Sequence, residues 1–338
     1  MQYRALGDSD LEVSAIGFGG WPMGGHRYGG SNDDEEVGAV RRALDTGINL
    51  FDTASGYGLG HSETVLGRAL KGRWDDVVVV TKTGICWEEA SQRFVRDSRP
   101  EQIQEQCETS LRNLGTDRID VYLIHWPDPD TQMDVTMRAM ENLQDAGKIA
   151  YVGASNFPPA LMDQARAVVS IVANQVGYHM LDRRNADQII PYCATNGIGV
   201  MAYGSLAHGV LTGTFTEDPK FDDDDWRKPG YAFGLPLFHP RHLSATLEAV
   251  DEVTSAAASA GLTTSQLALR WVLEEPAIST ALVGFRNADE VDSAVAALES
   301  ELPNGVLDAA NIATRTAYDR LLIAEQPEKE IGPGRRTS

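Results

Sequence analysis

Four polar side chains stand at or just beyond the ends of apolar stretches, where parallel strands would bring them together. Asp52 lies near the end of NLFDTA, Tyr57 follows in the turn SGYG, Lys82 ends VVVVTK, and His125 follows in YLIHW. Isolated charges this close to buried strands are costly, so we expect Asp52 and Lys82 to form an ion pair. An ammonium beside the Tyr57 phenol favours phenolate and lowers the tyrosine pKa from its usual value of about 10. The four residues therefore predict proton transfer at a carbonyl or an alcohol.

Each of these residues alone has a simpler structural explanation. A strand-end aspartate or lysine is often half of a structural ion pair, a turn tyrosine is often exposed, and a histidine after a strand is often a satisfied core residue. Their occurrence at the ends of successive strands favours an active site, because four independent coincidences would otherwise have to fall on one edge of the sheet.

The rest of the chain alternates between strand-like apolar runs and amphipathic stretches, which indicates a parallel sheet covered by helices. Two of these stretches, 33–47 and 100–115, carry helix start signals at one end and a glycine at the other. The number of strands favours a closed (β/α)8 TIM barrel, an α/β fold, over an open sheet. The expected strands are 13–20, 49–54, 77–82, 119–126, 151–155, 171–177, 199–204 and 280–285.

Two additions to the barrel are expected. An N-terminal β-hairpin leads into the first strand, because β-forming residues flank the turn DSD. The segment 205–241, after the seventh strand, is too polar and too rich in proline and glycine for a regular element and predicts a long loop. We expect 1–338 to be one domain, with the barrel at about 13–298 and a C-terminal extension at 299–338. No GxGxxG segment follows a strand, so a Rossmann fingerprint is absent.

Composition narrows the class of function. A net charge of −20 over 338 residues leaves no basic surface for nucleic acid or an anionic membrane, and solubility is the simplest reason for it. Cys86, Cys107 and Cys193 are widely spaced without a CxxC pair, which predicts reduced thiols, no disulfide framework and no metal site. The sequence shows neither an apolar signal segment nor a membrane-length apolar run, so we expect a cytoplasmic protein with no membrane partner.

The same motifs resemble the aldo-keto reductase family, from about Tyr3 to Leu298. FDTASGYG is similar to the family's segment with the aspartate and tyrosine, VVVVTK to its lysine strand, and LRNLGTDRIDVYLIHWPD to the segment ending in its histidine. The resemblance implies hydride transfer between a nicotinamide and a carbonyl carbon, with Tyr57 as the acid. In the family pattern Lys82 and Asp52 tune the tyrosine, and His125 orients the substrate oxygen. The glycine-rich start and the insertion WEEASQRFVRDSRP resemble bacterial inositol-utilisation aldo-keto reductases.

The resemblance also implies where the nicotinamide binds. AGKIAYVGASNF and NQVGY are similar to the segments that hold its carboxamide, here with Ser155, Asn156 and Gln175. In MAYGSLAHGVLTG, Tyr203 falls where the family stacks a ring on the nicotinamide, and Gly204 and Leu206 follow as cofactor-binding residues.

The adenosine end of the expected cofactor site departs from the family pattern. The chain has Val283-Gly284 where Pro-Gly is common, and Ser293-Ala294 where an acidic residue followed by asparagine is common. Arg286 falls where a basic residue often meets the 2′-phosphate of NADP, whereas Glu290 could accept from a free ribose hydroxyl. We expect Gly284, Arg286 and Glu290 to bind the cofactor. Arg286 favours NADP(H), with NAD(H) as the alternative.

The substrate pocket is expected between Trp21 and Trp126, which follow the first and fourth strands at the catalytic face. The long loop carries further aromatic residues beside the acidic run 222–225, which either overhangs the barrel mouth or is a solvated bend that never meets substrate. These aromatic residues are Trp226, Tyr231 and Phe233. Aromatic walls with strand-end polar groups suit a small neutral sugar, cyclitol or aryl carbonyl better than a keto acid.

Two other functions compete with an oxidoreductase. A barrel glycosidase needs two carboxylates about 5 to 10 Å apart, and Asp52 is the only convincing strand-end carboxylate. A non-catalytic, cofactor-bound regulatory subunit, as in channel-associated members that resemble this family, would show slow turnover and a stable larger assembly. The sequence has no obvious docking tail for such a role. The sequence leaves open the oligomeric state, the physiological substrate and the direction of the reaction.

Overall fold

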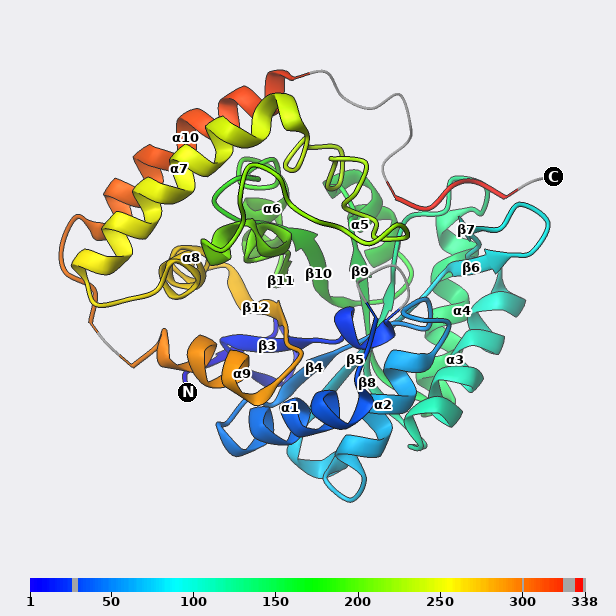
Figure 1. The fold of residues 1–338 in the computed structure, drawn as a ribbon. Helices are drawn as coiled ribbons and strands as arrows, with labels where there is room; N and C mark the ends of the chain where they lie inside the picture. Colours follow the sequence, from blue (N-terminus) through cyan, green and yellow to red (C-terminus); the bar gives the residue numbers. More distant parts are fainter. Residues whose placement is uncertain (26–29, 300, 325–331, 337–338) are drawn as a thin grey trace.

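The computed structural model describes residues 1–25, 30–299, 301–324 and 332–336. Its centre is a closed barrel of parallel strands in the order β10-β11-β12-β3-β4-β5-β8-β9. Figure 1 looks into this barrel, with the helices arranged around it. The barrel strands are β3 (Ile16–Gly19), β4 (Leu50–Asp52), β5 (Val78–Thr83), β8 (Ile119–Ile124), β9 (Ile149–Ser155), β10 (Ile171–Gly177), β11 (Gly199–Tyr203) and β12 (Ile278–Gly284).

The predicted (β/α)8 barrel is confirmed, and each expected barrel strand overlaps an observed one. The strands form because their β-branched and apolar residues are buried on both faces, as in β5 and β10, where every residue is buried. The expected strand 13–20 is divided in the structure. Val13 pairs with Arg4 in the N-terminal hairpin of β1 (Tyr3–Ala5) and β2 (Glu12–Ser14), and the barrel strand begins only at Ile16.

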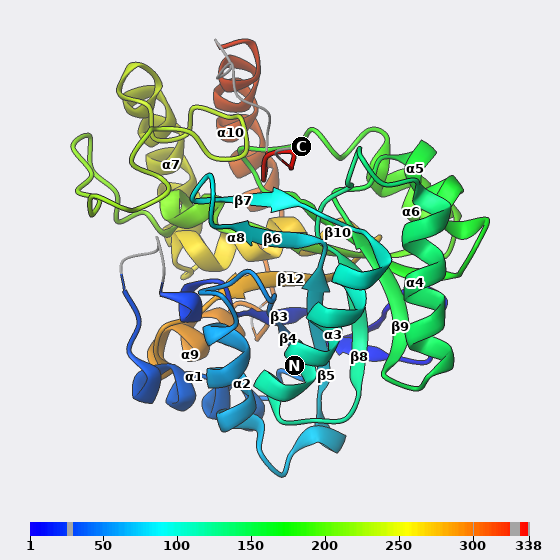
Figure 2. The ribbon, with the colours of Figure 1, turned by 90° about the vertical axis from the view of Figure 1, so that its right-hand side faces the viewer.

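The outer layer consists of helices that follow the barrel strands along the chain (Figure 2). The expected start and stop signals are observed in α1, which has acidic residues in its first turn, and in α3, which begins at Pro100 and ends at a left-handed Gly115. These outer helices are α1 (Asp33–Asp45), α2 (His61–Leu70), α3 (Pro100–Leu114), α4 (Met133–Asp145), α5 (Pro159–Arg166), α6 (Ile189–Thr195), α8 (Thr264–Leu273) and α9 (Ala288–Ala296).

Two additions shape the carboxyl-end face of the barrel. The insertion before α3 folds as an antiparallel hairpin of β6 (Ile85–Glu88) and β7 (Arg93–Arg96). The expected loop 205–241 begins with a short 3-10 segment, η3 (Ala207–Thr212), and runs irregularly to α7 (Pro240–Ser259). Despite its composition, the part 234–238 is buried.

The expected C-terminal extension 299–338 contains α10 (Val306–Ile323), which packs lengthwise against α7 (Figure 1). Residues 300, 325–331 and 337–338 of this extension lie outside the described residues. Among the described residues, no helix is long and apolar enough to cross a membrane.

Candidate active site

Lys82 lies at the centre of the site, fully buried near the end of β5. Its Nζ donates to Oδ2 of Asp52 at 2.8 Å, to the carbonyl oxygen of Thr53 at 2.7 Å and to the hydroxyl of Tyr57 at 3.2 Å. The three acceptors fill the three donor positions of an ammonium group. The ion pair expected between Asp52 and Lys82 is therefore present, and the tyrosine shares the same cation.

Tyr57 is positioned by the turn between β4 and α2, where local geometry demands glycine. Gly58 has a φ of 60°, and a Cβ at this position would lie 2.2 Å from the carbonyl oxygen of Gly24 in the short helix η1 (Pro22–Gly24). The backbone beside Tyr57 is thus pressed against η1. The ring of Trp21, just before η1, stacks on the Tyr57 ring with centroids 5.9 Å apart and 17° between the planes.

His125 follows β8 directly, and its ring and the Tyr57 ring form a T-shaped pair with a centroid distance of 5.7 Å. Burial, reinforced by the positive charge of Lys82, holds the pKa of His125 well below its usual value. The imidazole is therefore neutral at physiological pH. A neutral ring nitrogen that carries hydrogen donates to an oxygen without adding a charge to the site.

Burial also acts on the buried ion pair itself. It lowers the pKa of Lys82, against the attraction of Asp52. It raises the pKa of Asp52, against the attraction of Lys82 and the hydrogen bond from Gln175. The two pKa values move towards each other, so Lys82 releases a proton more readily than an exposed lysine does.

A group of amide and hydroxyl side chains lies beside the ion pair, at the ends of β9, β10 and β11. Ser155 Oγ donates to the carbonyl oxygen of Gln175 at 2.9 Å, and the Tyr203 hydroxyl donates to Asn156 Oδ1 at 3.0 Å. Asn156 has a φ of 62°, a conformation that asparagine tolerates better than most residues, and its Nδ2 donates to the carbonyl oxygen of His125 at 3.2 Å. The residues expected to hold the carboxamide thus lie together beside His125.

These residues border a cleft of about 690 Å³ at the carboxyl ends of the strands. Lys82 lies behind Asp52 and Tyr57 and does not line it, whereas all the other expected site residues do. Those lining residues are Trp21, Asp52, Tyr57, His125, Trp126, Ser155, Asn156, Gln175, Tyr203, Gly204, Leu206, Gly284, Arg286 and Glu290. The cleft also reaches Ser293 and Ala294 on α9.

Near α9 the cleft is lined by Arg286, which favours NADP(H), and by Glu290, which favours NAD(H). Arg286 and Glu290 are both exposed, and the backbone N–H of Arg286 donates to Oε2 of Glu290 at 2.8 Å. One carboxylate oxygen of Glu290 is thus already engaged, while the Arg286 side chain is solvent-accessible at the rim.

The long loop adds aromatic rings to the lining of the cleft. Trp226 stacks on Trp21 with centroids 5.0 Å apart, and Phe233 also lines the cleft. Tyr231, the third aromatic residue named in this loop, does not line the cleft, and its ring packs against His239 at the start of α7. In the acidic run, residues 222–224 are exposed, while Asp225 is buried and forms an ion pair with Arg227.

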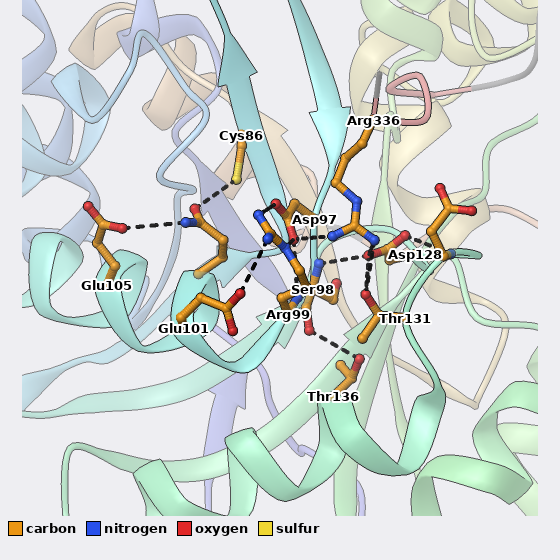
Figure 3. Close-up of polar contacts among 12 residues, drawn as sticks. Cys86, Asp97, Ser98, Arg99, Glu101, Glu105, Asp128, Thr131, Thr136 and Arg336 are labelled. Atoms are coloured by element: carbon orange, nitrogen blue, oxygen red, sulfur yellow. Dashed lines mark hydrogen bonds and ion pairs between the residues drawn. The ribbon is translucent and has the colours of Figure 1, made fainter. Parts of the chain in front are cut away.

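The C-terminal tail also reaches the cleft, which the sequence did not predict. Gly334 pairs with Val95 beside the β6–β7 hairpin, and Gly332 lies against Trp126, where an added Cβ would be 3.0 Å from the indole. Figure 3 shows Arg336 between two buried carboxylates, Asp97 at 2.9 Å and Asp128 at 3.5 Å. No local motif marks residues 332–336, because they are held by partners more than 200 positions earlier in the chain.

Comparison with known proteins agrees with this geometry. Residues 15–313 match the model of the Aldo/keto reductase family. The chain is 38% identical to aldo-keto reductase YhdN of Bacillus subtilis (strain 168) over 87% of each chain. It is 32% identical to the NADH-specific methylglyoxal reductase of Escherichia coli (strain K12), over 89% of this chain and 95% of the relative. The structure of the glycerol dehydrogenase AKR11B4 from Gluconobacter oxydans superposes with a TM-score of 0.83 and 34% identity, covering 98% of this chain and 99% of that one.

Proposed function

The chain belongs to the aldo/keto reductase family, and on this premise we propose that it is an NAD(P)(H)-dependent oxidoreductase. It interconverts an aldehyde or ketone with the corresponding alcohol, sugar or cyclitol. One observation carries the proposal: Lys82 Nζ lies within hydrogen-bond distance of both Asp52 and the Tyr57 hydroxyl, and these two partners line the cleft.

The cleft suits a dinucleotide in shape and chemistry. It has amide groups and the Tyr203 ring at one end and the exposed Arg286 at the other. Ser155, Asn156 and Gln175 would hold the carboxamide. Gly284, Arg286 and Glu290 would hold the adenosine end. When bound, such a cofactor supplies a hydride to the carbonyl carbon or accepts one from the alcohol.

The protein's own side chains handle the proton. In reduction, the Tyr57 hydroxyl gives its proton to the carbonyl oxygen, and the adjacent ammonium of Lys82 stabilises the phenolate that remains. Asp52 holds Lys82 in place, and neutral His125 donates a hydrogen bond that orients the substrate oxygen. In oxidation the same groups act in reverse.

For the cofactor we propose a preference for NADP(H). An arginine binds a phosphate through charge-assisted hydrogen bonds, often two at once. Glu290, the residue that would favour NAD(H), already accepts a backbone hydrogen bond with one oxygen. The Escherichia coli relative is named as NADH-specific, so NADH is the competing cofactor in the assays described below.

For the substrate we propose a small uncharged carbonyl or polyol. Trp21 and Trp126 supply aromatic walls near Tyr57, and His125 adds no charge. Two similar proteins are named for methylglyoxal and glycerol, which are both small and neutral.

The test is a panel of methylglyoxal, an aryl aldehyde, glycerol, an inositol and an anionic keto acid. Reductions are assayed with NADPH and NADH, and oxidations with NADP⁺ and NAD⁺. We expect kcat/KM for the best neutral substrate to exceed that for the keto acid by at least about tenfold. A preference for the keto acid would contradict the substrate class. Turnover absent with every pair would instead favour a cofactor-bound regulatory subunit.

A further inference from the structure

The loop over the cleft contains a tight turn with an unexpected residue at its tip. Ala232 and Leu235 exchange backbone hydrogen bonds of 2.8 and 2.9 Å around the two residues Phe233 and Gly234. Both central residues have positive φ values, 47° and 85°. This is the pattern of a type I′ turn, whose first central position favours asparagine or glycine. An aromatic residue there is strained, because its Cβ crowds the backbone.

A second contact holds the strained turn in place. One guanidinium nitrogen of Arg184 donates to the carbonyl oxygen of Phe233 at 3.0 Å. Arg184 is itself fixed by a bidentate pair with Asp182, at 2.8 and 2.6 Å, and Asp182 is buried in the turn after β10. The barrel therefore fixes the position of Phe233 from outside the loop that carries it.

The Phe233 ring lines the cleft and contacts both Tyr203 and Trp126. On one side it meets the ring of Tyr203 with centroids 5.2 Å apart. On the other it is nearly parallel to Trp126, with centroids 6.4 Å apart and 8° between the planes. The rings of Trp21 and Trp226 also lie close to Phe233, with centroid distances of 6.1 and 5.8 Å. The ring thus extends the aromatic wall formed by the two tryptophans that the sequence assigned to substrate.

The surroundings of Phe233 explain why an aromatic ring is kept in a strained position. The turn itself would form more readily with asparagine, so the backbone of the turn does not favour phenylalanine there, and the ring is kept for its contacts with its surroundings. The ring of His208 also faces Phe233 at 5.2 Å, and burial keeps the pKa of His208 well below its usual value. The wall is therefore aromatic and uncharged. Backbone strain that local structure does not require is typical of functional sites.

We propose that Phe233 determines substrate specificity by packing its ring against the apolar substituent of the carbonyl substrate. This inference rests on the proposed oxidoreductase function and refines its substrate class. Carbonyls with an aryl or alkyl substituent long enough to reach Phe233 are preferred over compact ones such as methylglyoxal. The contact is between rings and adds no step to the chemistry at Tyr57.

The test combines stability with specificity in Phe233→Asn. Asparagine suits the turn but loses the packing of the partly buried ring against the hydrophobic cluster under the loop, so we expect the melting temperature to fall by about 5 to 10 °C with the variant still folded. Without the ring, kcat/KM for an aryl aldehyde should fall about tenfold or more, while kcat/KM for methylglyoxal changes less than about threefold. The matched control is Gln92→Asn, which replaces another positive-φ residue (φ 51°) in the β6–β7 turn, away from the cleft. This control should leave kcat/KM unchanged for both the aryl aldehyde and methylglyoxal.

Two results would overturn the proposal. An equal loss for both substrates, with a weaker Kd for NADPH measured by fluorescence, would show that Phe233 acts on the cofactor. Unchanged kcat/KM for both substrates would show that the ring is only structural. Phe233→Leu keeps an apolar side chain and should retain more of the aryl activity than the asparagine variant. All comparisons are made against an active wild type, so absence of wild-type turnover would contradict the oxidoreductase function and not this contact.

Discussion

The side-chain Nε2 of Gln175 donates a hydrogen bond of 2.7 Å to Oδ1 of Asp52, although the residues are 123 positions apart in the chain. Because Lys82 bonds to Oδ2, each oxygen of the carboxylate has its own partner. The residue that family resemblance assigns to the carboxamide therefore also touches the buried ion pair. Changes at either residue should therefore affect the other.

Replacing Tyr57 with phenylalanine should lower kcat by about 10²- to 10⁴-fold, because the transferable proton is lost while the ring remains. Cofactor Kd, measured by quenching of tryptophan fluorescence, should stay within about threefold. Tyr151→Phe is the matched control, since the Tyr151 hydroxyl donates to Asp10 outside the cleft. Near-normal kcat in the Tyr57 variant would refute its assignment as the acid.

Replacing Lys82 with methionine should destabilise the fold by about 3 to 5 kcal/mol, because Asp52 is then a buried charge without its cation. Adding Asp52→Asn should restore much of this loss, since the second change removes the stranded charge. Both the single and the double variant should be inactive. Urea unfolding measures the stabilities, and a double variant no more stable than the single one would show that the pair is not energetically coupled.

Replacing Arg286 with alanine should raise KM for NADPH by about 10- to 100-fold, corresponding to the loss of one charge-assisted contact of about 1.5 to 3 kcal/mol. KM for NADH should change little. Arg41→Ala, an exposed arginine on α1, controls for the general loss of positive charge. Equal losses for the two cofactors, or a wild type that prefers NADH, would indicate that Glu290 determines the preference instead.

The buried histidines predict a pH-dependent stability. Burial lowers the pKa of His125, His179 and His208, that of His179 to about 4. Unfolded histidine has a pKa of about 6.5, so between pH 6.5 and 4 the unfolded chain binds more protons and the free energy of unfolding falls as pH decreases. His179 alone should account for about 3 kcal/mol at pH 4.

The carboxyl groups of Asp52 and Glu63 act in the opposite direction, because burial raises the pKa of each in the folded state. A comparison of wild type with His179→Asn isolates the histidine contribution. Asparagine preserves an acceptor for the backbone N–H of Leu181, which now bonds to His179 Nδ1 at 3.2 Å. In the variant, the free energy of unfolding should fall less steeply as pH decreases. The difference in slope should correspond to at most one bound proton. An identical slope in the two proteins would mean that His179 does not titrate as expected.

The sequence alone determined the fold and the location of the reactive groups. Alternation of apolar strands and amphipathic helices is a local signal, and strand ends in a parallel barrel meet at one face, so the positions of Asp52, Lys82 and His125 in the chain are enough to place them together. Tyr57 could be added because it lies in the glycine-flanked turn directly after the second barrel strand, β4.

The tertiary structure decided what closes the cleft. Tyr231 and Phe233 are two residues apart in the same loop, yet one packs on His239 and the other enters the cleft, because a positive φ at Phe233 and the anchor from Arg184 set the direction of the turn. The tail near Arg336 is held by carboxylates from Asp97 and Asp128. Such contacts join distant parts of the chain and leave no periodicity to read, so only folding brings them together.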